Sequence, residues 1–280
     1  MTAVNSTSPI DPGGRVVLIG AGKMGGALLQ GWLELGLDPD LVSVFDPDPS
    51  ADLRHLVHQH GVHILSDLGP EEPAQLVVLA VKPQMLDEAL PNAAQMLAPG
   101  GMLLSILAGK TLEALKAGLP AGSAVVRAMP NTPAAIGRGM TVAVASPSVT
   151  PAQRATANAL LSAVGEVAWI EEESLMDAVT AVSGSGPAYV FLLAESLTRA
   201  GIKAGLPIEL AARLARVTVA GSGELLGRST LGADQLRVNV TSPGGTTAAA
   251  LEVLMAEGGM DALLEEAVAA AARRSRELAG

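Results

Sequence analysis

The residues best suited to bind a ligand in this chain are three spaced glycines. They lie in Gly20-Ala21-Gly22-Lys23-Met24-Gly25, between the apolar run Val16 to Ile19 and a segment with helical periodicity. We expect Gly20 to permit a tight turn, Gly22 to leave room for a pyrophosphate, and Gly25 to let the helix approach the strand. The first N–H groups of that helix would also attract an anion. The pattern predicts a dinucleotide site, and the alternative is a close strand-to-helix turn without a ligand.

Two other segments combine hydroxyl groups with glycines. Ser183-Gly184-Ser185-Gly186-Pro187 and Thr241-Ser242-Pro243-Gly244-Gly245-Thr246-Thr247 each precede a helical pattern. Such turns could simply cap a helix, or their N–H groups could bind a carboxylate. A glycine pair exceeds what a cap requires, which favours a ligand for the second segment. There, Ser242, Thr246 and Thr247 could hydrogen-bond a polar substrate atom.

An acidic residue follows the second expected strand. Asp46 ends the strand-like segment Leu41 to Phe45, about 20 residues beyond the glycine turn, where an acid hydrogen-bonds the adenosine ribose. Its charge would also repel a 2′-phosphate, which favours NAD over NADP. The alternative is an ordinary acidic turn, Asp46-Pro47-Asp48-Pro49, before a helix that starts near Ser50.

Two more apolar segments end in residues that could border the same ligand. Leu76 to Val81 is followed by Lys82-Pro83, and Met102 to Leu107 by Ala108-Gly109. Continuous apolar runs of this kind are typical of strands buried in a parallel sheet. In doubly wound sheets ligands bind beyond the carboxyl ends of the strands, so we expect both endings beside the cofactor.

The next expected strand, Ala124 to Ala128, includes a charged residue and leads into a proline-rich loop. Arg127 is interpreted either as an anion ligand or as a surface charge at the strand end. Between two prolines, Met129-Pro130-Asn131-Thr132-Pro133 holds polar groups in a rigid loop at the sheet edge. Loops of this kind often shape a binding site.

The four histidines lie close together, which raises the possibility of a metal. Only His55 and His58 share a helical face, and Gly61 breaks the helix after His60. No cysteine or suitably spaced acid completes a tetrahedral set with them or with His63. We therefore expect a solvated helix end and no metal site.

Composition limits the class of protein. With 280 residues, 49% apolar content and no long apolar run, the chain can form a sizeable core and lacks the pattern of a membrane helix. A net charge of -10 disfavours nucleic acid and anionic membranes as partners. The absence of cysteine and of signal-peptide features in residues 1–14, which we expect to be a mobile tail, favours a cytoplasmic location. The mean hydropathy of +0.39 favours a homo-oligomer.

The pattern of strands and helices changes near Glu171. Strand and helix patterns alternate over residues 15–170, which predicts an α/β domain of the Rossmann type for binding a dinucleotide. Residues 171–280 show helical periodicity interrupted by Gly/Pro loops and no convincing strand. We therefore expect an all-α second domain.

Five motifs in this order resemble the pyrroline-5-carboxylate reductase family, from about Val16 to Leu278. They are Gly20 to Gly25, Ala80-Val81-Lys82-Pro83, Met129 to Pro133, Ala181-Val182-Ser183-Gly184-Ser185-Gly186-Pro187-Ala188-Tyr189, and Thr241 to Thr247. The resemblance implies reduction of L-Δ1-pyrroline-5-carboxylate to L-proline by NAD(P)H, the last step of proline biosynthesis. It also implies that the helical domain forms a dimer, commonly within a ring of five dimers.

The same resemblance assigns roles to individual positions. It implies that the glycine turn holds the pyrophosphate and that Val81, Lys82 and Pro83, with Ala108 and Gly109, border the nicotinamide. The substrate carboxylate would bind to Ser242, Gly244, Gly245, Thr246 and Thr247, with Thr247 also facing the ring nitrogen. Two positions depart from the family. Asp46 replaces a small polar or basic residue, which leaves the choice of cofactor open, and Val238 replaces a frequent acid.

Two other functions fit parts of the pattern. A β-hydroxyacid or 6-phosphogluconate type dehydrogenase also joins a dinucleotide fold to helices, but it needs a lysine acid/base in the helical part. Lys203 is the only lysine after Glu171, and it lies away from both glycine segments. A non-catalytic nucleotide-sensing module would be expected to have a degraded substrate loop, whereas Thr241 to Thr247 is intact.

Overall fold

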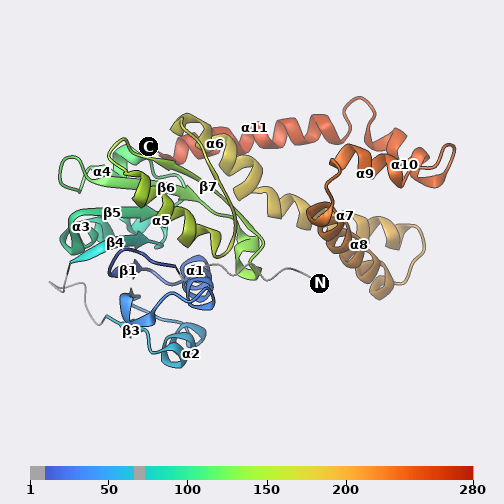
Figure 1. Cartoon of the computed structure of the whole chain (residues 1–280). Helices are drawn as coiled ribbons and strands as arrows, with labels where there is room; N and C mark the ends of the chain where they lie inside the picture. Colours follow the sequence, from blue (N-terminus) through green and yellow to red (C-terminus); the bar gives the residue numbers. More distant parts are fainter. Residues whose placement is uncertain (1–9, 66–72, 280) are drawn as a thin grey trace. The chain divides into compact units, whose positions relative to one another are not determined.

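A computed structural model describes residues 10–65 and 73–279 (Figure 1). It divides into two compact units, one formed by residues up to Gly184 together with Ala272 onward, and one formed by Ser185–Ala271. The first nine residues of the expected N-terminal tail lie outside the described residues. The domain ranges 15–170 and 171–280 stay a prediction.

Unit 1 is built on an eight-stranded sheet in the order β3-β2-β1-β4-β5-β6-β7-β8. Neighbouring strands are parallel except β6 and β7, which are antiparallel, so β7 and β8 run against the other six. The strands are β1 (Val16–Ile19), β2 (Val42–Phe45), β3 (His63–Ile64), β4 (Ala74–Leu79), β5 (Leu97–Ser105), β6 (Ala124–Met129), β7 (Gly139–Ala145) and β8 (Gly165–Trp169). The Rossmann-type α/β fold is thus confirmed, with a longer sheet than six parallel strands would give.

Alternating strand residues build two cores, one on each face of the sheet. Val16 and Leu18 of β1 belong to the first core, and Val17 and Ile19 belong to the second. Helices α1 (Lys23–Glu34), α2 (Ala51–His60) and α5 (Pro151–Ser162) supply the first core, whereas α3 (Leu86–Met96), α4 (Leu112–Lys116) and α6 (Met176–Val179) supply the second. Both faces are covered, which explains the continuous apolar runs of the central strands.

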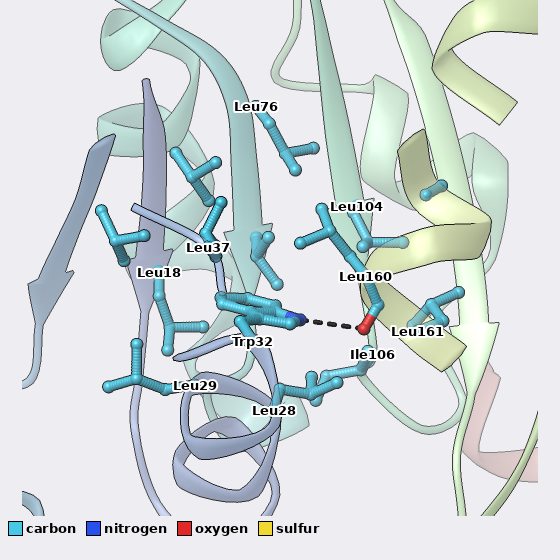
Figure 2. Packing of buried hydrophobic residues seen from close by; sticks show 14 of the residues in the cluster. Leu18, Leu28, Leu29, Trp32, Leu37, Leu76, Leu104, Ile106, Leu160 and Leu161 are labelled. Carbon is cyan, nitrogen blue, oxygen red and sulfur yellow. Dashed lines mark hydrogen bonds between the residues drawn. The ribbon is translucent and has the colours of Figure 1, made fainter. Parts of the chain in front are cut away.

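The first core is centred on Trp32 of α1, whose side chain is fully buried (Figure 2). Its indole Nε1–H donates to the carbonyl of Leu160 in α5 at 2.9 Å. One residue earlier, Gly31 lets the two helices approach, since a Cβ there would lie 2.8 Å from the Ala163 carbonyl oxygen. The contact joins two helices that are far apart in sequence.

Unit 2 is entirely helical in the described residues. It consists of α7 (Gly186–Lys203), α8 (Ile208–Arg228), α9 (Ala233–Asn239), α10 (Thr246–Leu254) and the first part of α11 (Met260–Ala279), whose last turns belong to unit 1. Only Ala211 and Ala215 are buried hydrophobic residues among those described in this unit. Unit 2 by itself therefore lacks a core. Among the described residues, no helix is long and apolar enough to cross a lipid bilayer.

Candidate active site

The glycine turn between β1 and α1 has the geometry expected of its first and third glycines. Gly20 has φ +87°, and a Cβ there would lie 2.8 Å from the Val81 backbone nitrogen. A Cβ on Gly25 would overlap the Gly20 carbonyl oxygen. Both residues must be glycine because the turn, the helix and the end of β4 meet without space for a side chain.

Gly22 differs, because a Cβ there would have no atom of the described residues within 4 Å. The residue opens onto a groove of about 670 Å³ along α1 and α2, lined by Ala21, Gly22, Lys23, Gly26, Ala27, Gln30, Ser50, Asp52, Leu53, His55, Leu56 and Gln59. Among the described residues, no side chain caps the start of α1, which leaves its first N–H groups for another acceptor. Open space and uncapped N–H groups together fit a dinucleotide pyrophosphate.

Asp46 supports this turn directly. Its Oδ2 accepts from the Ala21 N–H at 2.8 Å, and its Oδ1 accepts from the Asp48 N–H at 3.0 Å. Asp46 thus shapes the acidic turn before α2, whose cap is Ser50, and its carboxylate lies beside the glycine turn. Its contact with a ribose stays a prediction.

The ends of β4 and β5 reach the same edge of the sheet as the glycine turn. The Ala80 N–H donates to the Ile19 carbonyl at 2.8 Å, and the Ile106 N–H donates to the Leu79 carbonyl at 3.0 Å. The residues predicted to border a nicotinamide follow these bonds: Val81 half-buried, Lys82 exposed, Pro83 half-buried, Ala108 exposed, and Gly109 buried with φ +72°. The structure thus places all twelve predicted cofactor residues along one edge, from β2 to β5.

The two interpretations of Arg127 are both wrong. The side chain is buried, and its Nη1 lies 2.7 Å from Oε1 of Glu173. The same oxygen accepts from the Leu112 N–H at 2.7 Å. Arg127 is therefore neither exposed nor available to an anion. Glu173 has no local pattern that would have identified it as the partner.

The segment Ser183–Pro187 is not the loop that the sequence predicts. A wide helical turn of the π type, Thr180–Gly184, joins α6 to α7, which starts at Gly186 without a side-chain cap. Pro187 has no N–H to give to the Ser183 carbonyl. The Asn131 side chain donates to that carbonyl at 3.2 Å, and its Oδ1 accepts from the Met140 N–H at 2.8 Å. The proline-rich loop before β7 therefore stabilises this helical turn.

Of the segment Ser242–Thr247, residues 242–245 form a loop, and Thr246 and Thr247 begin helix α10. Gly244 has φ +67°, and the Gly245 N–H donates to the Ser242 carbonyl at 3.0 Å. Gly245 occupies the cap position of α10, and no side chain in the described part of the chain caps that helix. Ser242, Gly244 and Thr246 are exposed, and Thr247 is half-buried. Helix capping by these hydroxyls is thus excluded as the explanation of the motif.

The histidines lie at the exposed side of α2 and on β3. His55 and His58 are exposed, and the helix ends at His60 because Gly61 adopts φ +74°. Within residues 10–65 and 73–279, no three His, Asp or Glu side chains form a group that could hold a metal ion.

Comparison with known proteins identifies both parts of the chain. Residues 173–278 match the family model described as pyrroline-5-carboxylate reductase dimerisation, and residues 15–109 match the model described as NADP oxidoreductase coenzyme F420-dependent. A pyrroline-5-carboxylate reductase from Synechocystis sp. is 44% identical over 93% of this chain and 97% of its own length. One from Pseudomonas aeruginosa is 40% identical, with 95% and 97% covered.

The chain belongs to the pyrroline-5-carboxylate reductase family. Among solved structures, the pyrroline-5-carboxylate reductase from Coxiella burnetii has a TM-score of 0.88 at 34% identity, covering 95% of this chain and 99% of that one. The Plasmodium falciparum pyrroline carboxylate reductase, solved with NADP bound, has a TM-score of 0.79 at 29% identity and covers 95% of this chain and 98% of its own.

Membership of the pyrroline-5-carboxylate reductase family decides several predictions. The chain is an NAD(P)-dependent oxidoreductase with a Rossmann-type domain, and its helical part is of the dimerisation type, so the chain self-associates. These findings do not favour a β-hydroxyacid dehydrogenase or a nucleotide-sensing module.

Proposed function

We propose that this chain reduces the imine of L-Δ1-pyrroline-5-carboxylate with NAD(P)H and so forms L-proline. The observation that carries the proposal is the start of α10. Its hydroxyl and glycine motif is complete, and no side chain of the residues that the structure describes caps the helix. Such a loop offers backbone N–H groups and hydroxyls to a small carboxylate without placing a fixed positive charge there.

The proposed roles divide between the two units. In unit 1, Gly20 to Gly25 hold the coenzyme pyrophosphate, Asp46 bonds the adenosine ribose, and Val81, Lys82, Pro83, Ala108 and Gly109 form the wall beside the nicotinamide. The bound coenzyme supplies the hydride. In unit 2, the substrate carboxylate is held by Ser242, Gly244, Gly245, Thr246 and Thr247.

Orientation supplies most of the rate enhancement. A protonated imine accepts hydride readily, so the protein needs neither a covalent nucleophile nor a strong acid at this step. The Thr247 hydroxyl faces the ring nitrogen and relays a proton from solvent, while the N–H groups at the start of α10 fix the carboxylate. The ring carbon then receives the hydride in a defined geometry.

The decisive experiment follows the absorbance of the reduced nicotinamide with purified protein and pyrroline-5-carboxylate. Activity with NADH or NADPH supports the proposal, and no activity with either would refute it. Thr247→Ala should lower kcat/KM by about 10- to 100-fold, because one hydrogen bond to a charged group is lost. The affinity of Thr247→Ala for the coenzyme should be unchanged. Thr198→Val is the control, because it also removes a threonine hydroxyl, but one that donates to the Ala194 carbonyl within α7. Its kcat/KM should equal that of the wild type.

We also propose a cytoplasmic location and assembly beyond the dimer, up to a ring of five dimers. The location rests on the cysteine-free composition and on the biosynthetic reaction. The assembly rests on the large apolar surface of the unit 2 helices. Light scattering of the purified protein would distinguish a dimer from a decamer by mass.

A further inference from the structure

We infer that Glu173 is a positioning residue for the nicotinamide, acting through the turn that joins β5 to α4. This turn, residues 106–112, carries Ala108 and Gly109, so the inference rests on the role proposed for those two residues. Glu173 bonds the end of this turn at Leu112, and Leu278 of α11 lies beside Gly109.

Glu173 binds two parts of unit 1 with one oxygen atom. Its Oε1 accepts from the Leu112 N–H, the first of helix α4, at 2.7 Å and from Arg127 Nη1 of β6 at 2.7 Å. The Arg127 side chain is 6% exposed and that of Glu173 is 29% exposed. A charge-assisted bond in a partly buried place is among the stronger single contacts. Glu173 therefore fixes the end of the turn where α4 begins.

The other end of the turn is fixed by strand β5. The Ser105 Oγ accepts from the Leu107 N–H at 3.3 Å, and the Ser105 side chain is fully buried beside Arg127 in the paired strands. Ala108 and Gly109 lie between this bond and the Glu173 bond. Their position is thus set by two hydrogen bonds. The first is to Ser105 at the end of β5, and the second is to Glu173, which lies outside both β5 and α4.

A second carboxylate, that of Asp177, bonds the last helix, α11, to α6. Asp177 lies four residues after Glu173, and its Oδ1 accepts from the Ser275 hydroxyl of α11 at 2.6 Å. Ser275 is 5% exposed. Three residues later, Leu278 covers Gly109, since a Cβ built on Gly109 would lie 3.6 Å from the Leu278 Cβ. Figure 1 shows the end of α11 beside α6, in agreement with the bond between Ser275 and Asp177.

These contacts have a consequence for hydride transfer. The reacting carbon of the nicotinamide must be held at near-bonding distance from the imine, and a misplacement of about 1 Å can cost about 100-fold in rate. A turn held by Glu173 and covered by Leu278 gives the ring a fixed wall. Without the Glu173 carboxylate, Ala108 and Gly109 would remain beside the nicotinamide, but their position would be less restricted.

The test compares Glu173→Ala, Glu173→Gln and Ser275→Ala in the full-length protein. Each variant is assayed for kcat and KM, and for its affinity for the reduced coenzyme and for ADP-ribose, which lacks the nicotinamide ring. Glu171→Gln is the control, because the Glu171 side chain is 84% exposed and its contact with Arg154 is 3.4 Å long. Thermal unfolding shows whether each variant is folded.

Glu173→Ala should lower kcat by at least about 10-fold and weaken coenzyme binding more than ADP-ribose binding. Glu173→Gln should recover most of the loss because its amide oxygen can accept both hydrogen bonds. Ser275→Ala should change the same two readouts in the same direction by about threefold.

A folded Glu173→Ala variant with wild-type kcat and a wild-type ratio of coenzyme affinity to ADP-ribose affinity would overturn the inference. Equal weakening of coenzyme binding and of ADP-ribose binding would overturn it as well. If Glu173→Ala does not fold, Ser275→Ala decides, and unchanged kcat and affinities in Ser275→Ala would then overturn the inference. A wild-type protein inactive on pyrroline-5-carboxylate would refute the proposed function instead, while the two affinities would still test the role of Glu173.

Discussion

At the scale of single residues, Gly22 and Gly25 are close in sequence but are glycine for different reasons. A side chain on Gly22 would enter open space, whereas one on Gly25 would overlap the Gly20 carbonyl. We expect Gly22→Ala to keep the unfolding temperature and to weaken coenzyme binding at least about 10-fold, because the methyl group would occupy the place of the pyrophosphate. Calorimetric titration measures this affinity.

Gly25→Ala provides the contrast. Its Cβ would force apart the turn and α1, so this variant should lose about 1 to 3 kcal/mol of stability, as overpacked sites do. Denaturant unfolding measures that loss. If Gly22→Ala bound coenzyme as the wild type does, the pyrophosphate would have to lie elsewhere.

Asp46 is expected to influence the choice between the two coenzymes. Its carboxylate, fixed by the Ala21 N–H, would repel the 2′-phosphate of NADPH. Asp46→Ser should raise kcat/KM for NADPH relative to NADH by at least about 10-fold, because the variant no longer places a negative charge near the 2′-phosphate. The comparison requires initial rates with both coenzymes.

Asp48→Asn is the matched control for Asp46→Ser, because Asp48 is exposed and its backbone N–H bonds Asp46, so the substitution keeps that bond. Its coenzyme ratio should equal that of the wild type. If Asp46→Ser left the ratio of kcat/KM for NADPH to that for NADH unchanged, Asp46 would have only its structural role in the turn.

At the scale of elements, the contact between α1 and α5 depends on Trp32 (Figure 2). Trp32→Phe should cost about 2 kcal/mol of stability, because the buried Leu160 carbonyl loses its donor and a small cavity remains. Trp169→Phe is the control: its indole N–H donates to Asn158 at 3.0 Å, but the side chain is half-buried. Equal losses in the two variants, measured by urea unfolding, would contradict this account.

Most of the elements could be predicted from the sequence, because their apolar patterns are strong. The expected strand Leu76 to Val81 appears as Ala74–Leu79, and the expected strand Ala124 to Ala128 appears as Ala124–Met129. Strand β3 was not predicted, because two residues carry no pattern. The direction of β7 was also not predicted, although the short link 130–138 leaves no room for the crossover helix that a parallel neighbour needs.

The site was less predictable where contacts join distant segments. Glycine spacing revealed the turn after β1, since that motif is local. The Arg127–Glu173 pair joins β6 to a segment beyond β8, and no local pattern indicates it. At Ser183–Pro187, glycine and proline favour a loop, but the Asn131 amide satisfies the carbonyl that Pro187 leaves unbonded, so a helical turn forms instead.

At the scale of the whole molecule, the exposed apolar side chains of unit 2 explain self-association. Phe191 is 64% exposed on α7, and Val217 is 62% exposed on α8. A unit that cannot bury these side chains alone is stabilised by a second copy. The unfolding temperature should therefore rise with protein concentration, and Phe191→Glu should lower it and reduce the mass measured by light scattering.

Ile64→Glu is the control for this prediction. Ile64 is also an exposed apolar residue, at 37%, but it lies on β3 at the edge of the sheet in unit 1. The assembly of the Ile64→Glu variant should have the same mass in light scattering as that of the wild type. A wild-type unfolding temperature independent of concentration would argue against association through the unit 2 helices.

Helix α11 ends in the unit to which the first strands belong, and this affects folding during synthesis. Chains emerge from the ribosome N-terminus first, and domains generally fold as they appear. Here Ser275 and Leu278 leave the tunnel only after all of Ser185–Ala271 has been made. Nascent chains stalled before residue 272 should therefore assemble the eight-stranded sheet with the turn at Gly109 still uncovered, and protease sensitivity at that turn should disappear when translation proceeds.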